Sequence, residues 1–320
     1  MTLSSPRPLP AGAGYAADPA VRHAATSGGV GSTIIRYLLE SGAAAAAVSF
    51  TFDPRTLRYR PCLVTSAADY VSVGSIYHEV DLLGFLRGQA AALPGPLVCT
   101  CLPCQTKAVR SLLSRHGVGC FLIELTCSSQ QSFAATDYLL RRLHVAPRDV
   151  ALIRYRGNGW PGGIQITLRD GRQKFVGNIG SLWTRIFHSR LFCMPRCFSC
   201  PPAFGGPADI VLADPWRIDP PVPSEGRTLF AVRSPQGARL MEELCAKGLV
   251  RVDPVPDGSL AYSQEGTLRL KAAYARHRRS VRWLRRVCTH PAYRRAVTAW
   301  PLLFSFHVLW KRVFDKIVSR

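Results

Sequence analysis

Short apolar runs alternate with helical segments between residues 24 and 147, and this alternation constrains the fold more than any other feature. Residues 43–52, 95–104 and 118–127 each contain an apolar run of strand length, and helical periodicity follows between them. A further strand is predicted at 60–66. Strands that alternate with helices are typical of α/β folds. We therefore predict a largely parallel sheet with flanking helices in the first half of the chain.

The pattern changes after Pro147. Residues 151–156, 162–176 and 208–214 resemble strands joined by hairpin turns, without regular helices between them. We therefore predict a mixed α+β second half.

These patterns divide the chain into four predicted parts. The first contains small residues, proline and glycine but no apolar core segment, so we expect a disordered leader and not a secretion signal. The four parts are a leader (1–23), an N-terminal α/β part (24–147), a C-terminal part with a cysteine-rich loop (148–268) and a basic, aromatic helical tail (269–320).

Positive charge is concentrated in the tail. The chain has 41 basic and 20 acidic residues, and residues 269–320 hold 14 of the basic residues and one acid, Asp315, so that the tail carries +13 of the net +21. Such a tail favours nucleic acid or an anionic membrane surface as a partner. Nucleic-acid binding has no other support in the sequence, so we do not favour it. Mean hydropathy is high at +0.06. Even so, no uncharged apolar run reaches the ~18 residues that a transmembrane helix needs.

The tail contains an uncharged aromatic segment at residues 296–310. Fifteen residues in a helix cover about 22 Å, which is shorter than the ~30 Å hydrocarbon core of a bilayer. Pro301 is typical of a first helical position, so the helix is expected to begin there. We predict an interfacial helix with peripheral contact to an anionic membrane at its inner face. The alternative is that these residues pack on the body of the protein or on a partner subunit.

Eleven cysteines in a chain without a secretion signal favour the cytoplasm, where thiols remain free or bind metal. Four of them are candidate ligands: Cys104 and Cys127 lie at the ends of two predicted strands, and Cys197 and Cys200 form a CxxC loop. If the strands before Cys104 and Cys127 are neighbours, both thiols emerge at one sheet edge, where the loop with Cys197 and Cys200 could fold over them. Four thiolates would complete an iron–sulfur cluster or a zinc site. The alternative is that these cysteines are ordinary small hydrophobic residues.

Two glycine-rich segments are candidate ligand sites. The segment "TSGGVGST", residues 26–33, opens a predicted helix whose backbone amides would hold a phosphate, although it also suits a plain helix start. The segment "YRGNGWPGG", residues 155–163, places glycines around Arg156 and Trp160. It suits close approach to a planar or anionic ligand, or a tight hairpin loop.

Six segments, in order, resemble the coenzyme F420 hydrogenase/dehydrogenase beta-subunit family. They are "SGGVGSTIIRYLLESG", "VGSIYHEV", "CLPCQTKAVRSLL", "YRGNGWPGG", "CFSCPPAFGGPADIVLADPW" and "LFAVRSPQGARLMEEL". The resemblance spans roughly residues 25 to 275.

The resemblance implies an FAD-containing α/β domain beside a [4Fe–4S] cluster, which passes electrons between an iron–sulfur chain and an organic acceptor. The acceptor would be the deazaflavin coenzyme or a biosynthetic intermediate. The family's cluster ligands match Cys104, Cys127, Cys197 and Cys200, and Cys193 is a surplus or substitute ligand. Candidate FAD residues are, for the phosphates, Ser27, Gly28, Gly29 and Ser32 and, for the flavin or substrate pocket, Thr100, Gln105, Arg156 and Trp160.

Two departures from the family pattern bear on function. No ferredoxin-like cysteine segment precedes Cys62, so electrons would come from a separate donor such as a ferredoxin or reduced deazaflavin. The family's Cys-His-Gly is "CSSQ" here, so its histidine is absent. The alternative function is therefore a non-catalytic metal-binding scaffold or a partner subunit of the same fold.

Overall fold

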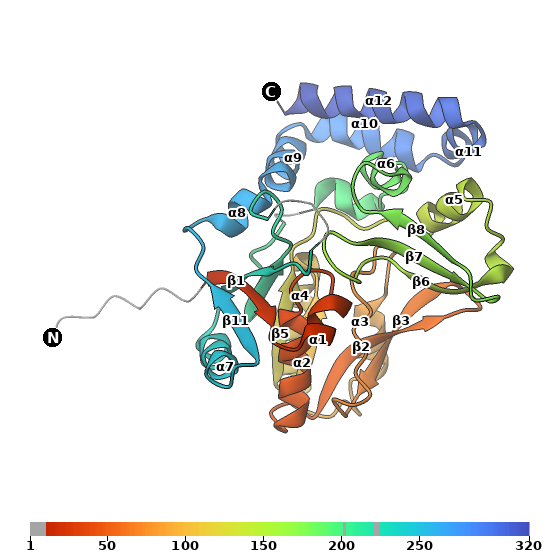
Figure 1. The fold of residues 1–320 in the computed structure, drawn as a ribbon. Coiled ribbons are helices and arrows are strands. Elements are labelled where there is room, and N and C mark those ends of the chain that lie inside the picture. The colour runs from red at the N-terminus through yellow and green to blue at the C-terminus, as the bar shows by residue number, and fades with distance from the viewer. Residues whose placement is uncertain (1–10, 201–202, 220–223, 320) are drawn as a thin grey trace.

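The computed structural model describes residues 11–200, 203–219 and 224–319 and contains two sheets (Figure 1). The large sheet has eight strands in the order β11-β1-β10-β9-β5-β4-β2-β3, and the small sheet has the order β6-β7-β8. The strands are β1 (Ala11–Ala16), β2 (Ala46–Asp53), β3 (Arg58–Val64), β4 (Leu97–Cys101), β5 (Cys120–Leu125), β6 (Val150–Arg154), β7 (Gly163–Leu168), β8 (Gln173–Gly177), β9 (Ile210–Ala213), β10 (Thr228–Val232) and β11 (Val250–Asp253).

The centre of the large sheet is parallel, which confirms the predicted α/β class. Strands β2, β4, β5 and β9 run parallel to one another, and β3 and β10 pair antiparallel with the two outer strands of this group. β3 follows β2 after a short turn, which is too short for the crossover that a parallel pair requires. The predicted strand at 60–66 therefore exists as the second strand of a hairpin.

Helices cover both faces of the large sheet, as a parallel core requires. On one face, Ile34 and Leu38 of α2 (Val30–Glu40) and Leu244 of α7 (Pro235–Ala246) pack with strand residues such as Val98 and Ile123. On the other face, α3 (Leu82–Gly88) and α4 (Pro103–Arg115) pack against the opposite side chains of the same strands. The central strands β4 and β5 are therefore largely buried on both faces, which explains why they are continuous apolar runs in the sequence.

The predicted disordered leader is wrong for residues 11–23. β1 is an interior strand paired antiparallel with both β10 and β11, and α1 (Pro19–Ala24) follows it. Its small residues are a packing requirement, because a Cβ at Gly12 would lie 2.9 Å from Val252 Cγ1 and 3.1 Å from the Phe230 ring. Residues 1–10 of the predicted leader lie outside the described residues.

The small sheet carries its own core. Ile153, Ile164 and Ile166 pack against α5 (Ala134–Arg142), α6 (Leu182–His188) and two tail helices. A 3-10 helix, η1 (Pro147–Asp149), precedes β6. The cysteine-rich loop follows α6 and contains a second 3-10 helix, η2 (Pro195–Ser199).

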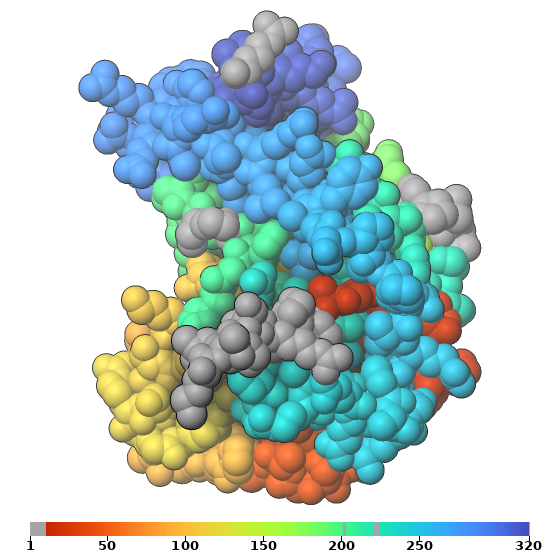
Figure 2. Space-filling model, turned by 90° about the vertical axis from the view of Figure 1, so that its left-hand side faces the viewer, coloured from red at the N-terminus to blue at the C-terminus, as the bar shows by residue number. Residues whose placement is uncertain are grey.

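The tail forms a helical layer at one end of the molecule (Figures 1 and 2). Cys193 and Phe198 of the cysteine-rich loop pack against this layer, so it covers the loop. The last helix begins at Pro301, as predicted. Within the described ranges, no helix is both long enough and apolar enough to cross a membrane. The layer consists of α9 (Glu265–Arg276), α10 (Arg278–Thr289), α11 (Pro291–Ala299) and α12 (Pro301–Val318), and the short helix α8 (Ser259–Ser263) precedes it.

Candidate functional site

A cavity of about 1020 Å³ lies beyond the carboxyl ends of β4, β5 and β9. Its wall includes Thr100, Cys127 and Asp214, which end or follow these three strands, and Ser32 from the start of α2. Cofactor sites are typically found at this edge of parallel sheets, and they usually occupy ~300–1,000 Å³. The cavity is therefore large enough for an extended cofactor.

The start of α2 faces this cavity. Ser27, Gly29, Gly31 and Ser32 line the wall, and the N-terminal cap residue Gly29 has φ +84° and offers no side-chain cap. A positive φ strongly favours glycine at this position. Because the first amides of a helix have no partner within the helix, this end can bind an anion such as a phosphate.

Gly28 has a different role from the one its sequence context indicated. A Cβ on Gly28 would lie 2.4 Å from the Gly14 carbonyl oxygen and 2.5 Å from the Thr228 amide nitrogen. The Gly28 amide donates to Thr228 Oγ1 at 2.9 Å. The absence of a side chain at Gly28 is thus required for packing against β1 and β10, whether or not a ligand is bound.

Arg156 is the most buried charged group of the cavity wall, with 1% of its side chain exposed. Its Nη1 donates to Asp214 Oδ2 at 3.0 Å and to the Tyr77 hydroxyl at 3.3 Å, and its Nη2 donates to the Thr26 carbonyl at 3.0 Å. Burial is the largest influence on its pKa and lowers it, but the negative charge of Asp214 and the contacts with Asp214 and Tyr77 together outweigh burial, so the pKa is raised. Arg156 is therefore a fixed cation in the wall.

Two buried polar atoms at the cavity have no hydrogen-bond partner among the described residues. They are Arg156 Nε, a donor, and Gln130 Oε1, an acceptor. Buried polar groups are normally hydrogen-bonded, and an unpaired one costs about 1–3 kcal/mol. Both residues line the cavity, so a polar ligand there would lie near the two unpaired atoms. Together with the open helix end and the volume, these atoms fit FAD.

The remaining predicted residues fall near the cavity with different functions. Thr100 and Gln105 line it, and Gln105 Oε1 also accepts from the Leu102 amide at 2.9 Å, which caps α4. Trp160 lies behind the wall, with its ring centroid 4.5 Å from that of Trp216. Trp216 itself lines the cavity.

Sequence reasoning missed several wall residues, above all Tyr77, Asp214, Trp216 and the segment 128–130. A signal for two of them was present in the sequence. Asp214 and Trp216 belong to the "ADPW" motif, whose acidic and aromatic residues are unusual directly after an apolar strand.

Four of the thiols lie in two pairs, Cys104 with Cys200 and Cys193 with Cys197, and the thiols of each pair shift each other's pKa. Cys127 lies within electrostatic reach of both Cys197 and Cys200. The Cys197 Sγ also accepts from the Gln130 amide at 3.5 Å. The tertiary structure thus brings together all four predicted ligands and Cys193.

Cationic side chains surround the thiols. A hydrogen bond from Cys104 lowers the pKa of Cys200 to about 6, and Lys271 of α9 acts in the same direction. A hydrogen bond from Cys197 lowers the pKa of Cys193 to about 7, assisted by Arg190. Burial raises the pKa of Cys127 to about 12. The same contacts raise the pKa of the partner thiols, Cys104 and Cys197, so each pair favours one thiolate, the form that binds metal, and one thiol.

These cysteines suit a cluster held by four thiolates, because three separate segments of the chain bring thiols together and positively charged side chains surround them. Within the described part of the chain, no three His, Cys, Asp or Glu side chains are already arranged around a common point to hold a metal ion. A bound cluster would therefore have to draw the thiols out of their present pairs.

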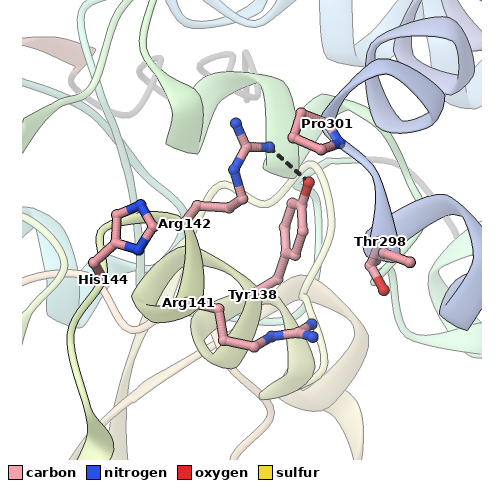
Figure 3. A pocket seen from close by; sticks show the side chains of 7 residues that line it. Tyr138, Arg141, Arg142, His144, Thr298 and Pro301 are labelled. Atoms are coloured by element: carbon pink, nitrogen blue, oxygen red, sulfur yellow. Dashed lines mark hydrogen bonds between the residues drawn. The ribbon is translucent and has the colours of Figure 1, made fainter.

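A second cavity of about 440 Å³ contains none of the predicted site residues (Figure 3). It lies between the end of α5 and the α11–α12 junction. Its wall includes Arg141, Arg142 and His144, and the Arg142 guanidinium donates to the Tyr138 hydroxyl at 2.9 Å. It is a basic pocket beside the start of α12.

Comparison with known proteins gives two family matches and a fold match. Residues 11–87 match the family described as the N-term of the coenzyme F420 hydrogenase/dehydrogenase beta subunit, and residues 96–258 match the one described as the C terminus of that protein. A chain in the xenon-derivatized F420-reducing [NiFe] hydrogenase complex from Methanosarcina barkeri is similar, with a TM-score of 0.62 and 15% identity. The match covers 87% of this chain and 94% of that one. At that identity the similarity establishes the fold alone. No curated protein matches.

Proposed function

Because the chain belongs to the coenzyme F420 hydrogenase/dehydrogenase beta-subunit family, we propose that it is a cytoplasmic oxidoreductase that uses FAD and a [4Fe–4S] cluster. It would pass electrons between an external carrier, the cluster, the flavin and an organic acceptor. The carrier would be a ferredoxin or reduced deazaflavin.

One observation supports this function most directly. Cys127 lines the large cavity and is also electrostatically coupled to Cys197 and Cys200. The proposed flavin site and the proposed cluster site therefore share a wall. An electron-transfer protein requires its two cofactors to lie close together in fixed positions.

The residues of the wall have separable roles in this proposal. The amides at the start of α2, with Ser27, Ser32 and the support of Gly28 and Gly29, would hold the pyrophosphate. Arg156, Thr100 and Gln105 would orient the flavin, and Trp160 would stabilise the wall through Trp216. Cys104, Cys127, Cys197 and Cys200 would hold the cluster, and Cys193, paired with Cys197, is a substitute. When bound, the flavin would exchange two electrons with the acceptor and single electrons with the cluster.

The acceptor is a deazaflavin coenzyme or a biosynthetic intermediate. The similar structure from Methanosarcina barkeri belongs to an F420-reducing complex, which supports the deazaflavin. Ser128, Ser129 and Gln130 line the cavity where the family has a histidine. Their hydroxyl and amide groups can bind an acceptor through hydrogen bonds but, unlike a histidine, do not change their protonation state near neutral pH.

Anaerobic purification followed by iron, sulfide and flavin assays tests this function. We expect about four irons and one FAD per chain. The double variant Cys197→Ser, Cys200→Ser should lose the iron, whereas Cys245→Ser, at an exposed position on α7, should retain it. Full iron content in the double variant would refute the ligand assignment.

The alternative is a non-catalytic metal-binding scaffold or partner subunit. The absent histidine at 128 favours it. The same preparation distinguishes the two, because a colourless protein that contains zinc and no flavin would support the scaffold and exclude the oxidoreductase.

A further inference from the structure

Helix α12 has two apolar faces. The inner face packs on the body through Phe304, Val308 and Val318, all of which are buried. The outer face is an apolar stripe that is 49–74% exposed and follows the helical period, formed by Leu302, Phe306, Leu309, Val313 and Ile317. Since the inner face already anchors the helix, folding of the described chain does not account for the outer stripe.

Further aromatic residues border this stripe. Trp300, directly before the helix, is 66% exposed, and Trp283 of α10 is 52% exposed with its ring centroid 5.7 Å from that of Trp310. Scattered exposed apolar residues are ordinary, but a contiguous stripe bordered by tryptophans is typical of an interaction surface.

The charge around the stripe has a single sign. Arg312 and Lys316 are exposed on α12 beside the stripe, and α10 exposes five arginines. The only acid among residues 269–320, Asp315, is bonded to Lys311 and accepts from the Tyr274 hydroxyl at 3.0 Å, so its charge is neutralised on the inner side. Near the start of α12, Arg141 and Arg142 line the basic pocket that Pro301 borders (Figure 3). The arginines on α10 are Arg278, Arg279, Arg282, Arg285 and Arg286.

We propose that the outer face of α12 docks on a membrane surface rich in anionic phospholipid. The helix, about 27 Å long at 18 residues, would lie in the plane of the interface. Its stripe would enter the boundary between headgroups and acyl chains. The arginines of α10 would bind lipid phosphates, and the tryptophans would lie at headgroup depth.

Membrane docking through α12 is compatible with the proposed electron transfer. α12 lies at the opposite end of the molecule from α2 and α7, which cover the large sheet (Figure 1). Docking there would leave the rest of the protein in the aqueous phase. The inference does not depend on the cofactors, so its test can use protein of any cofactor content.

The experiment measures flotation of the full-length protein with vesicles of phosphatidylcholine alone or with about 30% phosphatidylglycerol added. We expect binding to the anionic vesicles at low salt, release at about 0.5 M salt because charge attraction is then screened, and little binding to neutral vesicles.

Point variants locate the surface. Phe306→Gln with Leu309→Gln removes two stripe side chains and should weaken the vesicle affinity at least about tenfold. Arg279→Gln with Arg286→Gln should weaken binding to the anionic vesicles at least about tenfold and leave the weak binding to neutral vesicles unchanged. The matched control is Phe175→Gln, because Phe175 on β8 is as exposed as Phe306 and lies outside the stripe.

Thermal unfolding of each variant separates loss of folding from loss of binding. Point variants are preferable to deletion of residues 269–320, because deletion would uncover the apolar contacts of Phe198 and the small-sheet core. Two outcomes would overturn the proposal. In one, the unmodified protein ignores anionic vesicles at low salt. In the other, it forms a dimer that the stripe variant converts to a monomer, which would identify a second copy as the partner.

Discussion

The buried pair of Arg156 and Asp214 gives the sharpest test of the cavity wall. Replacing Arg156 by Gln removes three hydrogen bonds and leaves the Asp214 carboxylate without its cation. Removal of one partner from a buried ion pair costs about 3–5 kcal/mol. The Asp214 side chain is 21% exposed and borders the cavity, so water can partly solvate it. We therefore expect Arg156→Gln to lower the free energy of unfolding by about 2–4 kcal/mol.

Substitution of the other partner, Asp214, should lower the free energy of unfolding further. Asp214→Asn removes the negative charge beside the guanidinium of Arg156, which keeps its hydrogen bonds to Tyr77 and Thr26, and only 1% of that side chain is exposed. Water cannot replace the lost carboxylate there, so we expect the full ~3–5 kcal/mol. The double variant should cost less than the sum of the two single variants, with a coupling energy of about 1–3 kcal/mol.

Urea unfolding of the cofactor-free protein measures these energies, and FAD titration measures binding separately. If Arg156 contacts the flavin through its unpaired Nε, the Arg156 variant should also bind FAD at least about tenfold more weakly at temperatures where it remains folded. The reasoning is refuted if Asp214→Asn costs less than Arg156→Gln, or if the two costs add without coupling.

Three further predictions concern other parts of the molecule. Phe304 is fully buried, with its ring centroid 4.9 Å from that of Tyr138, so Phe304→Ala should destabilise the protein by about 3–5 kcal/mol. Phe306→Ala, on the outer face of α12, should change stability by less than about 0.5 kcal/mol. Urea unfolding of the two variants measures the difference. A Cβ at Gly206 would lie 2.0 Å from Thr106 Oγ1, and the Gly206 amide donates to the buried Glu124 carboxylate at 2.8 Å. Gly206→Ala should therefore displace the loop that contains Gly206 and lower the iron content of the protein more than its flavin content. Equal loss of iron and flavin would contradict this. Burial lowers the pKa of His307, so below about pH 6.5 the unfolded chain binds more protons than the folded chain. The free energy of unfolding should therefore fall as the pH drops below that value. Urea unfolding at several pH values should show a weaker pH dependence for His307→Gln.

The sequence by itself determined the class of the fold and much of the site. Apolar runs such as 118–127 are long enough for buried strands and alternate with helices, and only a sheet covered on both faces can bury them. Thiols that follow two neighbouring parallel strands must emerge at the same sheet edge. The sequence therefore placed Cys104 and Cys127 together on the condition that their strands are neighbours, and the structure shows that β4 and β5 pair directly.

Only the tertiary structure decided how β1, Gly28 and the tail pack. The small residues of 11–16 looked like a flexible leader because a strand between two others on a crowded sheet needs little side chain and so gives no hydrophobic signal. Gly28 is required by contacts with Gly14 and Thr228, which are distant in sequence.

The tail shows the same limit. Its sequence indicated an apolar helix from Pro301, but periodicity alone cannot distinguish a face that packs inward from one that remains open. The fold places Phe304 against Tyr138 and Lys271 beside Cys200, and leaves Phe306 exposed. Contacts between residues far apart in the chain decide these positions, because they depend on where the other elements end in space.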